Sequence, residues 1–230
     1  MGDKVQAILE TLTADMKEME TYGIMTRGQI MRVMAERRET EYVLNSSKAT
    51  SIDFLKAITY EKGLENQRAV FKKKTKFHKK LKCDFSIVKR IIHLYHRMVK
   101  KFKVDIELWK FYVSYLMKIK ATSLLKKILA ELIRILPKNS QSWNMSATAY
   151  SDCIGDVNTA RSLMQMGLRM NKEDKEMWVM YFKFEMNFLL KLKQREDVLR
   201  EEGMKIIDKP LNEEPKKELA IPDIPSYIYN

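Results

Sequence analysis

The fold is decided by a short aromatic stretch, Trp178-Val179-Met180-Tyr181-Phe182-Lys183-Phe184-Glu185, because its tryptophan belongs to a regular series. Trp143 lies 35 residues before Trp178, and Trp109 lies 34 residues before Trp143. A period near 34 residues is typical of stacked helix–turn–helix units, in which a bulky side chain recurs where neighbouring units touch. The spacing therefore predicts an all-α helical-repeat solenoid.

Other positions in each unit follow the same rhythm. Three residues after the tryptophans, one helical turn along the same face, lie Tyr112, Ser146 and Tyr181. An earlier segment fits with Phe54 in the place of tryptophan, followed by Tyr60 and Glu61 where the last unit has Phe184 and Glu185. We interpret these aromatic residues as parts of the architecture rather than as a ligand site, because burying an aromatic side chain is worth a few kcal/mol on its own.

Helix is the expected state along nearly the whole chain, because seven glycines and five prolines are few for 230 residues. Thr26, Asp84, Asp105 and Asp156 are the expected N-caps of four of these helices. We expect N-terminal helices with a basic insertion over residues 1–83, repeats over 84–203, and an extended tail over 204–230, which holds four of the five prolines. The apolar face of the first helix, about residues 4–21, should pack on the second helix or receive another subunit.

The net charge of +13 is unevenly distributed. Residues 1–20 and 201–230 each carry −3, so residues 21–200 carry +19. A basic body suits a nucleic acid or another anionic partner, although a lysine-rich composition can also serve only to keep helices soluble. Two cysteines without paired spacing, no signal peptide and no long apolar run predict a reduced, intracellular protein.

The strongest basic cluster lies between Arg68 and Lys82, which holds eight Lys or Arg residues, no acidic residue, and two phenylalanines. Such a segment can neutralise phosphates, and its aromatic rings can stack on unpaired bases. A nuclear-import signal and a solvated surface are the alternatives. The candidate RNA-binding residues are Arg68, Lys72, Lys73, Lys74, Lys76, Lys79, Lys80, Lys82, Lys89 and Arg90.

No catalytic chemistry is expected. His93 and His96 are three residues apart, but with three histidines and two unpaired cysteines the chain lacks the usual ligand set of a zinc site. The glycine-rich phosphate-binding motifs are missing from the sequence. We therefore expect a protein without catalytic residues, metal or cofactor.

The repeat pattern resembles the HAT (half-a-TPR) repeat, and this resemblance implies that Arg97, twelve residues before Trp109, is a further signature residue. Over residues 5–200 the chain is similar to the N-terminal part of the U-three small nucleolar RNA-associated protein six family. The similarity is carried, in order, by the first helix, residues 22–26, Glu39-Thr40-Glu41-Tyr42, Phe54 with Tyr60-Glu61, the basic run, and residues 109–113. Members of that family are typically longer, and Glu131 and Met166 replace the arginine in the later units.

The resemblance implies a non-enzymatic scaffold subunit of the UtpB module of the small-subunit processome, acting in pre-rRNA processing and 40S ribosome biogenesis. Its partners would be the propeller proteins of that module, pre-rRNA and small nucleolar RNA, and its location the nucleus and nucleolus. The alternatives are a HAT-repeat subunit of an mRNA splicing or 3′-end processing complex, and an autonomous RNA-binding protein. The apolar residues of the tail, such as Ile221 and Tyr227, are expected to lie along a neighbouring protein.

Overall fold

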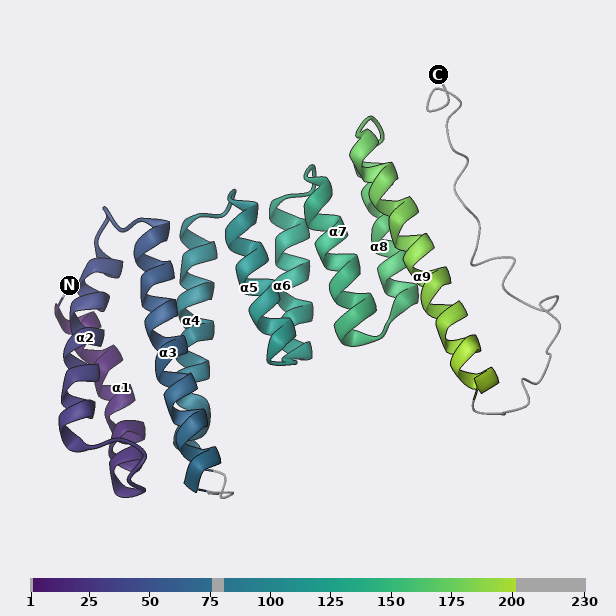
Figure 1. Ribbon diagram of the computed structural model, residues 1–230. Helices are drawn as coiled ribbons and strands as arrows, with labels where there is room; N and C mark the ends of the chain where they lie inside the picture. The colour runs from purple at the N-terminus through teal and green to yellow at the C-terminus, as the bar shows by residue number, and fades with distance from the viewer. Residues whose placement is uncertain (1, 76–80, 202–230) are drawn as a thin grey trace. The chain divides into compact units, whose positions relative to one another are not determined.

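The computed structural model describes residues 2–75 and 81–201, without the side chains of residues 2–4, 82 and 201. All regular elements in these ranges are helices, as predicted (Figure 1). They are α1 (Gly2–Thr21), α2 (Arg27–Asn45), α3 (Ser51–Thr75), η1 (Lys82–Phe85), α4 (Ser86–Lys101), α5 (Ile106–Lys118), α6 (Thr122–Ile135), α7 (Ser140–Ala149), η2 (Tyr150–Ile154), α8 (Val157–Met170) and α9 (Lys175–Glu201). Within the described ranges, every helix falls short of the length and apolarity that a membrane span requires.

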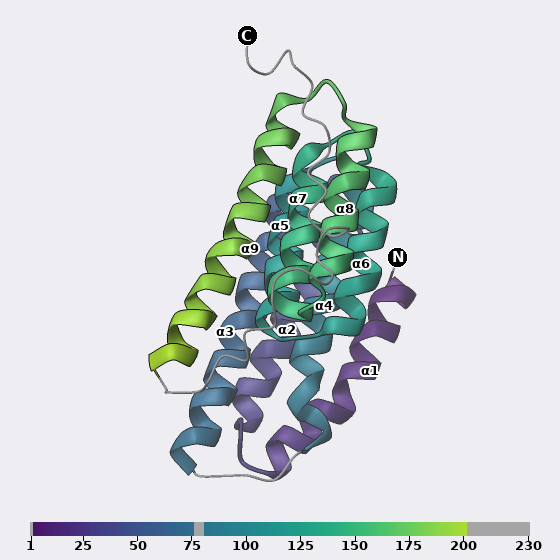
Figure 2. The same cartoon turned by 90° about the vertical axis from the view of Figure 1, so that its right-hand side faces the viewer.

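The chain forms two compact units, Met1–Met177 and Trp178–Asn230. In the first unit the helices pack as successive antiparallel pairs, α1 with α2, α3 with α4, α5 with α6, and α7 with α8 (Figure 1). Helices α3, α5 and α7 line up in one layer and α4, α6 and α8 in the other (Figure 2). One hydrophobic core extends from Met16 to Ala149 and so includes residues on both sides of position 83, while the division expected there stays a prediction. The second unit contains most of α9; the expected tail lies outside the described residues.

Most of the predicted caps are confirmed. Thr26 and Gln29 form a reciprocal capping box at α2, and the carboxylates of Asp105 and Asp156 accept backbone N–H groups at the starts of α5 and α8. The cap expected at Asp84 is wrong, because α4 begins two residues later and its N-cap is Phe85. The Asp84 carboxylate instead accepts the N–H of Leu81, 2.9 Å away, which stabilises the short helix η1.

One turn geometry recurs three times in the first unit. The turn follows α4, α6 and α8, whose C-caps are Phe102, Leu136 and Asn171. In that order, these C-caps have φ of −112°, −121° and −124° and ψ of 59°, 58° and 52°. Three residues later the backbone N–H of Asp105, Asn139 or Asp174 donates to the carbonyl of that C-cap, at 3.3, 3.3 and 3.1 Å. These turns are spaced 34 and 35 residues apart, so the period seen in the tryptophans is a period of the backbone.

Two of the tryptophans donate hydrogen bonds to these turns. The indole N–H of Trp109 donates to the carbonyl of Lys103 at 3.0 Å, and that of Trp143 donates to the carbonyl of Pro137 at 2.8 Å. Both acceptors lie six residues before the donor, and both tryptophans are buried. Each of these two indoles thus fills the core with its ring while its N–H donates to a carbonyl of the turn.

Gly167 in α8 is required by close packing, since a Cβ atom there would lie 2.8 Å from Cγ of Trp143 and 2.4 Å from the flexible end of Met177. We expect Gly167→Ala to destabilise the protein by about 1–3 kcal/mol, because the rigid indole must shift. Alanine is otherwise the better helix former by about 1 kcal/mol. The matched control is Gly63→Ala in α3, where a Cβ meets nothing within 4 Å and should stabilise the protein. Urea denaturation of both variants tests this; equal stabilisation by the two would contradict it.

Candidate nucleic-acid interface

The basic segment begins inside a helix. Helix α3 continues through Thr75, so residues 68–75 form its last two turns, whereas the sequence suggested an insertion between helices. Lysine and arginine are good helix formers, and a run of them does not by itself end a helix. The first half of the segment is therefore held on a rigid element that packs along α4.

Two of the candidate RNA-binding residues in this segment form ion pairs within the protein. Nη1 of Arg68 lies 2.7 Å from Oδ1 of Asp84, and Nζ of Lys72 lies 2.5 Å from Oδ2 of the same carboxylate. Arg68 also binds Glu65, one turn earlier on α3. Partial burial acts to raise the pKa of Asp84, but the N–H of Leu81 and the two cations outweigh it and hold that pKa below its ordinary value. These ion pairs connect the last turns of α3 to η1. Because Arg68 and Lys72 already bind Asp84, they are less available to bind a phosphate.

Of the remaining lysines of the segment, two are exposed on α3 and the side chains of the others lie outside the described residues. Lys73 and Lys74 are exposed in the last turn of α3, where a bound strand could reach them. Lys76, Lys79, Lys80 and the side chain of Lys82 lie outside the described residues, so their role stays a prediction. Phe71, which was expected to stack on a base, is partly buried against the hydrophobic core.

Helix α4 divides its basic residues between two faces. Its outer face carries Lys89, His93, His96 and Lys100, at spacings of four, three and four residues. Partial burial is the main cause that lowers the pKa of both histidines. The positive charge of Arg97 lowers the pKa of His93 further, and that of Lys100 lowers the pKa of His96 further. At neutral pH the two lysines therefore carry the charge of this face. Among the described side chains, no group of three His, Cys, Asp or Glu residues could hold a metal ion.

The inner face of α4 carries Arg90, and the expectation that Arg90 contacts RNA is corrected by its position. Its side chain is buried, with Nε 2.6 Å from Oε1 of Glu61 and Nη2 3.1 Å from Oε1 of Glu41. A guanidinium paired with two carboxylates in the interior is not available to a phosphate. Lys89, its neighbour in sequence, lies on the exposed face and remains a candidate.

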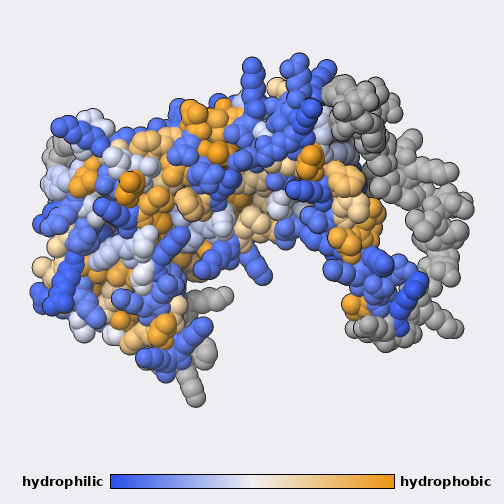
Figure 3. Space-filling model, turned by 45° about the horizontal axis from the view of Figure 1, so that its top comes forward, coloured by the Kyte–Doolittle hydropathy of each residue, from blue (hydrophilic) through white to orange (hydrophobic). Residues whose placement is uncertain are grey.

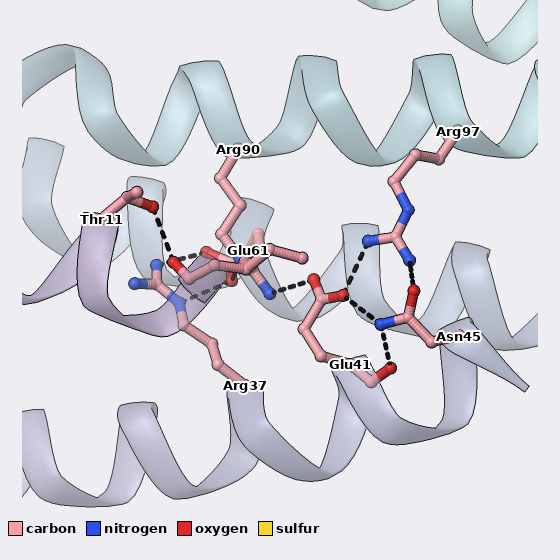
Figure 4. A network of polar contacts seen from close by, with 8 residues as sticks. Thr11, Arg37, Glu41, Asn45, Glu61, Arg90 and Arg97 are labelled. Carbon is pink, nitrogen blue, oxygen red and sulfur yellow. Dashed lines mark hydrogen bonds and ion pairs between the residues drawn. The ribbon is translucent and has the colours of Figure 1, made fainter. Parts of the chain in front are cut away.

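Arg90 belongs to a network of buried charges that joins three helices (Figure 4). Glu61 of α3 also binds Arg37 of α2 through two hydrogen bonds, Nε–Oε1 at 2.8 Å and Nη2–Oε2 at 2.7 Å. Glu41 of α2 binds Arg97 of α4 at 2.7 Å. Glu61 is 2% exposed, and its bonds to Arg37 and Arg90 hold α2, α3 and α4 together.

Arg37 and Glu41 are the functional positions that the sequence interpretation missed. Val33, Arg37, Glu41 and Leu44 recur at helical spacing on the buried face of α2, so two charges occupy apolar positions in the pattern. Tyr42, the residue after Glu41, is 48% exposed. Arg37 and Glu41 carry opposite charges and occupy positions of α2 where the helical pattern calls for apolar residues. Two such residues on one helix are the signal that could have indicated an internal ion-pair network.

The other signature residues of the first unit lie in its core or close to it. Phe54 is buried with its ring 6.2 Å from that of Phe102, and the Arg97 guanidinium lies over it. Tyr112 is fully buried and stacked on Tyr95, and burial raises its pKa to about 12. Tyr60 differs, because it is partly exposed on α3. The signature residues of the last repeat, which lie on α9 in the second unit, are Trp178, Tyr181 and Glu185.

Comparisons with known proteins agree on one family. A family model described as U3 small nucleolar RNA-associated protein 6 matches residues 9–90. The protein of that name from Schizosaccharomyces pombe is 30% identical over 200 residues, which cover 86% of this chain and 41% of the relative. Homologues from Dictyostelium discoideum and Homo sapiens are 25% and 24% identical, over 81% and 93% of the chain and 30% and 36% of their own lengths. The chain thus spans less than half the length of these curated relatives.

Proposed function

Because the chain belongs to the U3 small nucleolar RNA-associated protein 6 family, we propose that it acts as a non-enzymatic scaffold in the small-subunit processome. The observation that carries this proposal is the match to relatives whose names state an association with U3 small nucleolar RNA, over 86% of the chain for the S. pombe protein. Within that role we place the chain in the UtpB module, among propeller proteins, in the nucleolus.

The geometry of the first unit supports a scaffold. Its helix pairs share one continuous core, three of its inter-helix turns are alike, and its N-terminal helices are joined by buried ion pairs. Such an array presents long, fixed surfaces along which several partners can bind at once. The experiment is affinity purification of the tagged full chain from cells that express it. We expect U3 RNA and processome proteins; spliceosomal subunits instead would overturn the proposal.

We propose further that RNA within the particle contacts the exposed lysines at the end of α3 and on the outer face of α4. Lys73, Lys74, Lys89 and Lys100 are exposed on two helices that pack on each other. Cations at such positions release the counterions condensed on the RNA, which makes binding steeply dependent on salt. The same contacts carry no sequence information, so specificity would come from other members of the particle.

Replacing these four lysines by alanine is expected to weaken binding of a single-stranded U3 RNA fragment and to flatten its salt dependence. Each lost phosphate contact reduces the slope of log K against log salt by about 0.7, so the slope should fall by about 3. The control removes four exposed lysines elsewhere, Lys118, Lys126, Lys127 and Lys138. Fluorescence anisotropy at several salt concentrations measures both quantities. Equal slopes for the two variants would refute this interface.

A further inference from the structure

The outer side of the first helix pair holds a solvent-open groove of about 400 Å³ between α1 and α2. Among the described residues, its lining comes from these two helices, at positions 13, 16, 17 and 20 of α1 and 27, 30, 31, 34, 35 and 38 of α2. On both helices the positions advance by three and four residues, which places each set on a single helix face. The groove is therefore bounded by two straight stripes of side chains that run along its length.

The floor of the groove is apolar. Met16 and Ile30 are buried beneath it, Met34 is half-buried, and Met31 is 66% exposed. Methionine side chains are flexible and polarisable, and they are common on surfaces that adapt to an apolar partner. Figure 3 shows that hydrophobic residues lie between hydrophilic ones on the face of the molecule that it presents. No described element covers Met31, although the opposite side of α2 is packed on α3.

The dimensions suit a third helix. The lining of α2 extends over eleven residue steps, and at 1.5 Å per residue this is about 16 Å, or about three helical turns. A helix that lies along two antiparallel neighbours places its ridge of side chains into the groove between them. Ala35, one of the lining residues, is small enough to let the backbone of a bound helix approach α2 closely.

The rim of the groove is positively charged. Lys17 of α1 and Arg27 and Arg38 of α2 line it, with Glu20 as the single acidic residue among the lining side chains. Charge complementarity therefore favours an occupant with acidic residues beside its apolar face. A basic amphipathic helix and an RNA strand both fit less well, the first because of repulsion and the second because the floor is apolar.

We propose that the α1–α2 groove binds an acidic amphipathic helix of about three turns from another protein. This mode of recognition uses apolar anchors at helical spacing on one face, flanked here by carboxylates that pair with Lys17, Arg27 and Arg38. The inference deepens the proposed scaffold function, on which it rests, by giving one protein partner a position and a chemistry. The groove lies within residues 9–90, the part of the chain that the family model matches.

A peptide probe tests the chemistry directly on the full chain. The probe is a labelled helical peptide of about 14 residues with leucines on one face and glutamates beside them; the comparison peptide carries lysines in place of the glutamates. We expect the acidic peptide to bind at least tenfold more tightly, and Met31→Glu to weaken that binding at least tenfold. Glu36→Lys, on an exposed part of α2 outside the groove, should leave it unchanged. Equal binding of the two peptides, or no effect of Met31→Glu, would overturn the proposal.

Photo-crosslinking identifies the natural occupant. A photoreactive residue replaces Met31, or Glu36 as the control, in the full chain purified with its complex. The proposal requires that the Met31 position crosslinks to an acidic amphipathic segment of another protein and that the Glu36 position does not. Crosslinks to residues 202–230 of the same chain, to a second copy, to RNA, or to nothing would each overturn it. Recovery of U3 RNA in the same purification is a separate readout, so failure of the groove and failure of the scaffold function can be told apart.

Discussion

Replacing Glu61 by alanine is expected to lower the free energy of unfolding by about 3–5 kcal/mol, because the change leaves two buried arginines without their shared carboxylate. Arg37 is 1% exposed and Arg90 is 5% exposed, and each donates hydrogen bonds to Glu61. Among the described residues, Arg90 would then keep only Glu41, which it shares with Arg97, and Arg37 only a weak contact to the sulfur of Met16. An uncompensated cation in the interior costs far more than the lost hydrogen bonds alone.

The control for this prediction is Glu39→Ala, which removes an exposed glutamate from α2, one of the helices that the network joins. This substitution should change stability by less than about 0.5 kcal/mol. Glu61→Gln adds a second comparison, because it keeps the shape of the side chain and removes only its charge. Urea denaturation of the three variants measures the effect. If Glu61→Ala cost no more than Glu39→Ala, the network would not hold α2, α3 and α4 together in solution.

Replacing Trp109 by alanine is also expected to cost about 3–5 kcal/mol, in this case through a cavity in the core. The side chain is fully buried in the hydrophobic core, so its removal takes nearly all of its apolar surface out of the core packing. The substitution also frees the carbonyl of Lys103, which accepts the indole N–H in the turn before α5. Both losses fall on the same inter-helix turn, so the turn should open as well as the core.

Two further variants separate these contributions. Trp109→Phe keeps most of the apolar surface and removes the hydrogen bond, so it should cost less than Trp109→Ala. Phe111→Ala removes an aromatic ring that is 50% exposed on the same helix, and it should have a small effect. Equilibrium denaturation gives the stabilities, and amide hydrogen exchange over residues 102–106 reports on the turn. Equal costs at positions 109 and 111 would contradict the role of the buried indole.

The helical architecture could be predicted from the sequence because its signals are local. The caps at Thr26, Asp105 and Asp156 depend on residues two or three positions away, which a sequence displays directly. The tryptophan period was informative for a related reason. The indoles of Trp109 and Trp143 each donate to a carbonyl six residues earlier, so at these two positions the spacing of the tryptophans follows the spacing of the turns.

The ion-pair network could not be predicted in the same way, because it depends on how neighbouring helices are rotated. Arg90 and Lys89 are adjacent and equally basic, yet one is buried and the other exposed. The distinction follows from which face of α4 meets α3, and composition does not specify that face. Asp84 was misassigned for a similar reason, since its strongest partners are Arg68 and Lys72, sixteen and twelve positions away. Ion pairs between residues this far apart in the sequence produce no periodic pattern from which they could be predicted.

The three matching turns have a consequence for how the length of such an array can change. Each turn is closed by a short-range backbone hydrogen bond to the carbonyl of its C-cap, and successive C-caps lie 34 and 35 residues apart. Duplicating or deleting the segment from one C-cap to the next would therefore join one turn to another of similar backbone geometry. Proteins built on this plan can therefore be lengthened or shortened in whole modules, which allows one ancestor to reach partners at different separations.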